Sequence, residues 1–487
     1  MSEAASPAMA WPVIIQGGMG IGVSGWPLAR AVTRRGQLGV VSGTGIDSLF
    51  VRRLQDGDLG GHLRRAMERF PLPEVATTAL RDWWLAAGRP PGTPYRLLPM
   101  YQQAVSQARE RLSMLAAFVE VTLAKEGHAG RVGMNLLTKV QFPNLATLYG
   151  AMLAGVDCIL MGAGIPREIP GALDALASGR EARLRLEVEG DASDAVEHLR
   201  LDPAEVFAGG TPPALARPSF FAIVSSHSLA SVLARKATGR VDGFVVEAPS
   251  AGGHNAPPRG DAPRNELGEP VYGERDAVDL EKLRALGVPF WLAGGQGWPD
   301  RLRDALAAGA AGVQVGSLFA CCEESGLEPA LRRSLVEHAA RGEIDVFTDA
   351  QASPTGYPFK VVRWAEDPAR GVERERICDL GYLRTAYRTP TGGIGYRCAS
   401  EPEGAFAAKG GDVAETVGRR CLCNSLMATV GHAQLRAGGG VEPPLVTGGD
   451  DLKRLSEFLD GRTKYTAGEV IDWLLTGLAA EGEAPPG

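Results

Sequence analysis

Short apolar runs recur along the chain, each rich in valine and isoleucine, closed by glycine or serine, and mostly followed by a segment with helical hydrophobic spacing. Apolar strands without alternation are buried on both faces, which indicates a parallel α/β sheet with helices between the strands. Eight such units are what a TIM (β/α)8 barrel requires. The expected strands are Val13–Gly18, Leu38–Gly43, Arg131–Leu137, Val156–Gly162, Ser219–Ser225, Val241–Glu247, Pro289–Gly294 and Gly312–Leu318.

Two long stretches interrupt the alternation of strands and helices. In the first, at about residues 50–128, Val105, Leu112 and Leu115 fall at helical intervals, which predicts a helical insertion with a long amphipathic helix. The second, residues 179–218, is charged and ends in prolines, which predicts a peripheral flap.

The alternation of strands and helices stops after residue 342. We therefore expect one barrel domain at residues 11–342 and a C-terminal appendage at residues 343–487. Hydrophobic residues at 45% and charged residues at 22% are values of an ordinary globular protein with a sizeable core.

Charge and targeting signals narrow the list of partners. A net charge of −6 provides no basic field for nucleic acid or anionic lipid, so neither partner is expected. The first residues lack the basic and apolar regions of a signal peptide, and no run reaches the roughly 18 apolar residues that span a bilayer. We expect a cytoplasmic protein, whereas the oligomeric state is left open.

The seven cysteines, an odd number without a secretion signal, indicate reduced thiols. Cys378, Cys398, Cys421 and Cys423 fall in the appendage, where four thiolates would suit zinc or an iron–sulfur cluster. Their spacing lacks the usual C-x-x-C pairs. We predict structural thiols and no metal site, with a metal-stabilised appendage as the alternative.

The segment Gly20–Gly25 satisfies the G-x-G-x-x-G pattern of a dinucleotide-binding turn. Such a turn needs an acidic residue at the end of the second strand, but a serine and a glycine stand there and Asp47 comes only later. A tight turn without a ligand is a second interpretation. We favour a third, in which Gly17, Gly18 and Met19 end the first barrel strand at a mouth where the backbone can approach a flat cofactor.

Glycines also end the seventh and eighth strands. Gly294 and Gly295 close the seventh, with a helix starting shortly afterwards, and the eighth ends in Gln314, Gly316 and Ser317. Backbone N–H groups of these two loops form the usual phosphate site of such barrels, together with a helix N-terminus. The sequence therefore predicts a phosphate-binding site far along the chain from the first turn.

A histidine follows the sixth strand. That strand ends in Glu247, and the turn Gly252-Gly253-His254 brings an imidazole to the barrel mouth. Histidine suits proton transfer near neutrality, and catalytic residues of such barrels lie at this end of the strands. We predict that His254 is catalytic rather than an ordinary surface-loop histidine.

Five stretches carry a resemblance to a known family. The nitronate monooxygenases, formerly 2-nitropropane dioxygenases, and the related FMN-dependent enoyl-acyl carrier protein reductases are resembled, in order, by IIQGGMG, LARAVTRRGQLGVVSGTG, VGMNLL, EAPSAGGHN and LAGGQGWPDRLRDALAAGAAGVQVGSLF. The insertion and the appendage depart from the shorter, barrel-only members. A longer subgroup that acts as enoyl reductase with polyketide and fatty acid synthases also has extra C-terminal sequence, and ASPTGYPFKVV is similar to it.

The resemblance implies a barrel that holds FMN at its mouth. It implies that Gly18 and Met19 lie near the isoalloxazine, that Asn135 hydrogen-bonds the flavin, and that Gly253 and His254 border the reactive face, with His254 as acid/base. The residues implied to hold the ribityl phosphate are Gly294, Gly295, Gln314, Gly316 and Ser317.

Three functions are open on this basis. The resemblance favours oxidation of an alkyl nitronate by O2 to a carbonyl compound and nitrite. The alternative keeps FMN but uses NAD(P)H to reduce an enoyl thioester, on an acyl carrier protein for example, or a quinone. A noncatalytic scaffold is a third hypothesis, for which the long appendage is the only hint.

Overall fold

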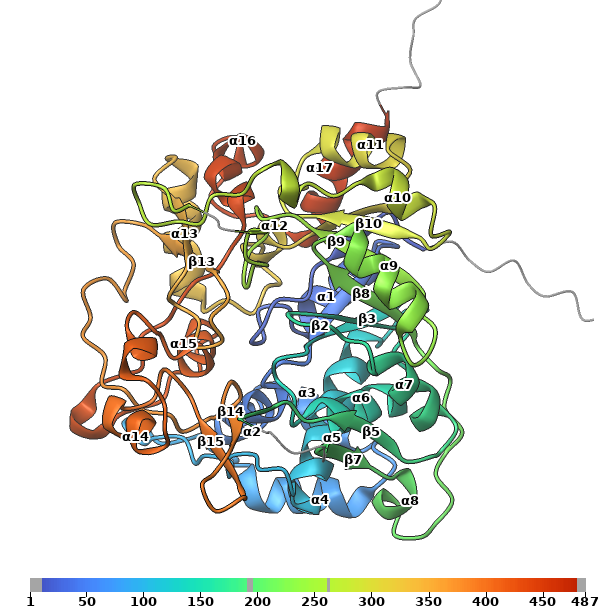
Figure 1. Cartoon of the computed structure of the whole chain (residues 1–487), viewed down its shortest axis with the longest axis vertical. Coiled ribbons are helices and arrows are strands. Elements are labelled where there is room, and N and C mark those ends of the chain that lie inside the picture. Colours follow the sequence, from blue (N-terminus) through green and yellow to red (C-terminus); the bar gives the residue numbers. More distant parts are fainter. Residues whose placement is uncertain (1–10, 191–195, 261–262, 480–487) are drawn as a thin grey trace, which may run out of the picture.

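Eight parallel strands form the centre of the fold in a computed structural model that describes residues 11–190, 196–260 and 263–479 (Figure 1). Their spatial order is β1-β11-β10-β9-β8-β4-β3-β2. Ile15 of β1 bridges Leu38, just before β2, and thereby brings the two edges of the sheet together. The predicted TIM barrel is confirmed. The strands are β1 (Ile14–Gln16), β2 (Gly39–Ser42), β3 (Val132–Leu137), β4 (Cys158–Gly162), β8 (Ser219–Val224), β9 (Gly243–Glu247), β10 (Phe290–Ala293) and β11 (Gly312–Val315).

Both faces of this sheet are buried, which explains the unalternated apolar runs. Ile14 packs outward with the helices, whereas Ile15 points into the barrel. Inside the barrel, Phe221 stacks on Trp291 with ring centroids 4.8 Å apart. Successive side chains of a strand point to opposite faces, so a strand covered on both sides needs apolar residues at every position.

Helices follow most of the strands and surround the barrel. The helices of the repeating units are α1 (Trp26–Arg34), α6 (Asn144–Leu153), α7 (Ile169–Ala177), α9 (His227–Lys236), α10 (Leu280–Arg284), α11 (Pro299–Ala307), α12 (Ser317–Ala320) and α13 (Pro329–Ala340). No helix in the described part of the chain is both long and apolar enough to cross a membrane.

The insertion after β2 contains α2 (Ile46–Gln55), α3 (His62–Met67), α4 (Pro73–Trp83) and α5 (Gln107–Ala124). The predicted long helix is α5, but it differs from the one-sided amphipathic helix we expected. From Leu112 onward it is buried on every side, because α1, α2, α3, α4 and α6 pack around it. The insertion thus extends the apolar core that lies between the barrel strands and their helices.

The topology rules out the dinucleotide-binding interpretation of the first turn, because β1 closes a barrel instead of lying in an open sheet. Ser24 folds this turn back, since its hydroxyl accepts the Met19 N–H at 2.7 Å. Asp47 is buried in α2 and pairs with Arg109 of α5 at 2.9 Å. Its carboxylate therefore holds the insertion together and does not face a ribose.

The later elements pack on the barrel at several places. The flap holds β5 (Ala182–Arg185), β6 (Val188–Glu189), β7 (His198–Leu201) and α8 (Pro203–Val206), and β6 pairs with β14 from the C-terminal part. At the top of Figure 1, α17 lies beside α11. The remaining elements are β12 (Asp345–Asp349), β13 (Phe359–Arg363), β14 (Thr385–Arg388), β15 (Ile394–Arg397), α14 (Glu403–Ala408), α15 (Leu422–Thr429), α16 (Leu455–Leu459) and α17 (Ala467–Ala479), with four short 3-10 turns.

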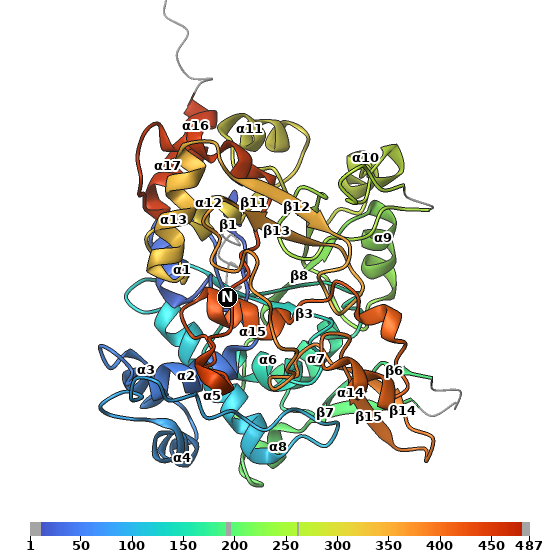
Figure 2. The same ribbon diagram turned by 90° about the vertical axis from the view of Figure 1, so that its left-hand side faces the viewer.

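The C-terminal third of the chain, whose described residues are 343–479, also reaches the carboxyl ends of the barrel strands. His254, after β9, forms an isolated bridge with Phe359 of β13, and the Lys360 N–H donates to the Gly253 carbonyl at 2.9 Å. Figure 2 shows β12 and β13 in front of β1 and β11. A division at residue 342 remains a prediction, and residues 480–487 at the end of the expected appendage lie outside the described residues.

Candidate active site

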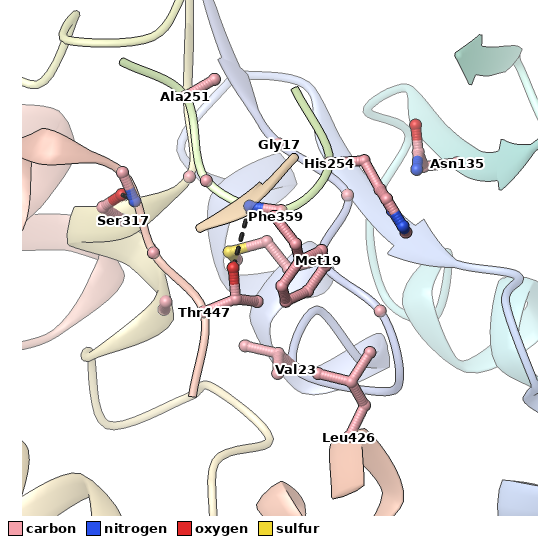
Figure 3. A pocket seen from close by; sticks show the side chains of 18 of the residues that line it. Gly17, Met19, Val23, Asn135, Ala251, His254, Ser317, Phe359, Leu426 and Thr447 are labelled. Atoms are coloured by element: carbon pink, nitrogen blue, oxygen red, sulfur yellow. Dashed lines mark hydrogen bonds between the residues drawn. The ribbon is translucent and has the colours of Figure 1, made fainter. Parts of the chain in front are cut away.

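A cavity of about 220 Å³ opens at the carboxyl ends of the barrel strands (Figure 3). By the same measure one water needs about 10–15 Å³, so the cavity has room for a much larger molecule. Every residue that the sequence predicted for the site lines it. These residues are Gly17, Gly18, Met19, Asn135, Gly253, His254, Gly294, Gly295, Gln314, Gly316 and Ser317. Their roles remain predictions, but the fold brings them together.

The turn after β1 lies close against β3. A Cβ on Gly18 would lie only 2.1 Å from the Cβ of Asn135, so glycine is the residue that permits this approach. Asn135 is 8% exposed and its side-chain amide has no hydrogen-bond partner within the described residues. An amide that lines a cavity without a partner offers both a donor and an acceptor to a bound molecule.

The loops after β10 and β11 provide unpaired N–H groups. Gly294 and Gly295 have φ angles of 84° and 67°, in the left-handed region that favours glycine. In the described part of the chain, the backbone N–H groups of Gly295 and Ser317 donate no hydrogen bond. The buried Oε1 of Gln314 also lacks a partner there. The two backbone N–H groups are donors that fit the anionic end of a ligand.

Part of the expected phosphate site is occupied by the chain itself. The Asp451 carboxylate accepts the Gly297 N–H at 3.1 Å and the Trp298 indole N–H at 3.2 Å, just before α11. Gly449 donates its N–H to the Ser317 hydroxyl at 2.7 Å. An acidic side chain therefore lies directly before the N-terminal end of α11, and the role of this end in binding a phosphate stays a prediction.

His254 is enclosed on two sides by the C-terminal third. Its Nε2 lies 2.7 Å from the Oγ of the fully buried Ser353, and its ring packs edge-on against Phe359 with centroids 4.9 Å apart. Burial lowers the pKa of His254 to about 4. The imidazole is therefore neutral at pH 7, and a neutral imidazole can accept a proton.

Glu247 is a second titratable group in the cavity. It ends β9, and its side-chain carboxyl has no hydrogen bond or ion pair to the described residues. Burial raises the pKa of its carboxyl to about 7. Carboxyl groups with such a pKa exchange protons readily near neutrality.

The C-terminal third also supplies an apolar wall that sequence reasoning missed. The cavity is lined by Phe359, Leu383, Leu422, Leu426 and Leu445 from this part of the chain, and by Leu335 of α13. Figure 3 shows Phe359, Leu426 and Met19 around the same cavity, and Thr447 accepts the Gly253 N–H at 2.8 Å. The only sequence signal for this wall was the similarity of ASPTGYPFKVV to the longer subgroup.

The C-terminal cysteines are free thiols. The Cys378 thiol hydrogen-bonds Cys398, and this contact together with burial raises the pKa of Cys378. Burial also raises the pKa of Cys421 and of Cys423, which lines the cavity. In the described ranges, no three histidine, cysteine or acidic side chains are arranged to hold a metal ion.

Comparison with known proteins gives a family for this part of the chain. The model of the family described as nitronate monooxygenase matches residues 207–355, which include Glu247, His254 and the loops after β10 and β11. The resemblance to the nitronate monooxygenases is thereby confirmed. The match indicates an oxidoreductase enzyme and leaves the cofactor and the substrate open. No curated protein sequence matches the chain.

Solved structures show distant likenesses over nearly the whole length. FabK from Thermotoga maritima is 15% identical, with 97% of this chain and 94% of that chain covered and a TM-score of 0.47. The nitroalkane oxidase from Streptomyces ansochromogenes is 15% identical, with 96% of each chain covered and a TM-score of 0.43. The enoyl reductase domain of MlnA from Bacillus amyloliquefaciens is 11% identical, with 96% and 94% covered and a TM-score of 0.47. Similarity at this level assigns no activity.

Proposed function

We propose that the protein is an FMN-dependent oxidoreductase that converts alkyl nitronates and O2 to a carbonyl compound and nitrite. The observation that carries the proposal is that the segment matched by the nitronate monooxygenase family supplies His254 and both glycine loops to one cavity. When bound, FMN supplies the electron acceptor for the oxidation, and the protein supplies position and electrostatics.

The residues of the cavity fit such a cofactor. The unpaired N–H groups of Gly295 and Ser317 would hold its phosphate, and the Gly17–Gly18 turn with Asn135 would lie against its ring. The unpartnered Oε1 of Gln314 can accept a further hydrogen bond.

His254 would take the proton of a neutral nitroalkane. Ser353 Oγ lies 2.8 Å from Thr355 Oγ1, so its hydroxyl can donate there and accept the Nε2–H of His254. This tautomer leaves the lone pair on Nδ1, which has no partner among the described residues. The proton moves from the carbon of the substrate to Nδ1. A pre-formed nitronate has already lost this proton and does not need the step.

A second candidate function is supported by the apolar wall. Its leucine side chains suit a substrate with a long apolar chain, such as an enoyl thioester reduced at the expense of NAD(P)H. Against it, a reductase in which His254 donates the proton needs the imidazolium. Burial lowers the pKa of His254 and disfavours that charged form in the resting protein, and the family match supports the first function. We therefore place this function second.

Anaerobic mixing separates the two functions. The flavin-loaded protein is mixed in turn with NADPH and with an alkyl nitronate, and the flavin absorbance is followed. Rapid bleaching by the nitronate with indifference to NADPH is the result expected for the proposal. Rapid bleaching by NADPH with indifference to the nitronate would replace it by the reductase. A protein that purifies without flavin and cannot be loaded would support a scaffold.

A further inference from the structure

Glu247 lies between two cavities. It lines the main cavity, and it also lines a small second cavity beside the loop that follows His254. Of the described residues, Glu247 alone lines both. Glu247, at the end of β9, is therefore the one described residue that the two cavities share.

The second cavity is polar and reaches the surface. Asn255 is only 2% exposed, and its buried Oδ1 has no partner, while its Nδ2 donates to the Ala251 carbonyl at 3.1 Å. The cavity of about 30 Å³ has room for roughly two waters. Ala256 and Arg259, also in its lining, are exposed. Water in this cavity would satisfy Asn255 and connect Glu247 with the solvent.

Among the residues that the structure describes, no charged neighbour is bonded to the Glu247 carboxyl. Around the second cavity, Arg259 donates its backbone N–H to Asp276 at 2.9 Å and directs its guanidinium to the Arg275 and Ser225 carbonyls. Tyr272 there donates to the Ala256 carbonyl. Besides Glu247, the titratable groups among the described residues that line the main cavity are His254, Cys321, Tyr382, Cys423 and Asp451. The raised pKa of Glu247 is caused by burial alone.

We propose that Glu247 is a proton relay between the main cavity and the solvent-connected second cavity. This inference rests on the proposed function, in which His254 removes one proton from each neutral nitroalkane. The Glu247 carboxylate takes up that proton from a water in the main cavity and becomes a carboxylic acid. It then releases the proton to a water in the second cavity and returns to the carboxylate. One proton moves per substrate, and no electron moves in this step.

The first test measures the relay group itself, without substrate. The carbonyl stretch of the protonated carboxyl is recorded by difference infrared spectroscopy against pH, for the flavin-loaded wild type, Glu247→Gln and the exposed control Glu266→Gln. A band that titrates near neutrality in the wild type and the control, and is missing in Glu247→Gln, is expected. If Glu247→Gln retains the band, or the wild type titrates only near the ordinary pH of a glutamate, Glu247 is not the relay.

The second test follows the proton during turnover. With a neutral nitroalkane, Glu247→Gln should turn over roughly 10²-fold more slowly, at the low end of what proton-transfer groups contribute. Small carboxylic acids in the buffer should restore part of the rate, because they carry the proton in place of the missing carboxyl. A pre-formed nitronate releases no such proton, so its turnover should match that of Glu266→Gln.

The outcomes separate the two proposals. A slow variant that no buffer acid rescues, with nitronate turnover lowered equally, would show a structural role and overturn the relay. If the wild type oxidises neither substrate, the proposed function fails, while the infrared titration still decides whether Glu247 exchanges protons near neutrality.

Discussion

A single methyl group at Gly18 should disturb the site because the turn after β1 touches β3. The added Cβ would lie 2.1 Å from the Asn135 Cβ, whereas ordinary contacts begin at 3.4 Å. The turn after β1 and strand β3 would therefore have to separate by about 1.3 Å (3.4 − 2.1). Both strands are held in the barrel, since Asn135 pairs with Ser42 on one side and Leu160 on the other. Overpacking of this kind costs about 1–3 kcal/mol.

The assay compares Gly18→Ala with Gly17→Ala by denaturant unfolding and by flavin absorbance per chain. A Cβ on Gly17 meets nothing closer than 3.5 Å, so this neighbour is a matched control. We expect a loss of about 1–3 kcal/mol of unfolding free energy and weaker FMN binding for Gly18→Ala, and a change within about 0.5 kcal/mol for Gly17→Ala. The double variant Gly18→Ala/Asn135→Gly removes the clash and should recover stability relative to Asn135→Gly. Equal stability of the two alanine variants would refute this reasoning.

Three further predictions concern the cofactor, the histidine and the thiols. Gly295→Asp should purify with little FMN, because two anions about 4 Å apart in a partly dry site repel by roughly 4 kcal/mol. The control Gly287→Asp has nearly the same φ of 68° but open space around it, so it should keep its flavin. Flavin absorbance per chain is measured for both variants. His254→Asn should lower nitroalkane turnover by roughly 10²–10⁴-fold and nitronate turnover less, since only the first substrate needs a base; equal rates to wild type with both substrates would remove its catalytic role. Metal analysis of protein purified without chelator should find far less than one metal per chain, and about one zinc or several irons would make the C-terminal part a metal-stabilised module.

The barrel could be predicted from the sequence because its strands are buried on both faces. Ile14 and Ile15 are adjacent, apolar and packed in different clusters, and this pattern is visible in a single sequence. The glycines at the strand ends could be predicted as site residues because the active sites of TIM barrels lie at the carboxyl ends of the strands. The insertion helix α5 was found by its spacing, but its burial on all sides depends on five surrounding helices that no periodicity shows.

The C-terminal side of the site could not be predicted in this way. The contact between Gly253 and Thr447 joins residues 194 positions apart, and it depends on one backbone N–H and one hydroxyl. Ser353 reaches His254 from a turn without regular spacing. The low pKa of His254 and the raised pKa of Glu247 follow from burial in the folded chain, so residue type alone gives neither value.

The most direct test of the proposed oxidation supplies an alkyl nitronate in air to the flavin-loaded protein without NAD(P)H. O2 consumption and nitrite release are measured together on the same sample. The account predicts that nitrite forms as O2 is consumed, and that the protein without its flavin forms none. A flavin-loaded protein that consumes no O2 and releases no nitrite from the nitronate would contradict it.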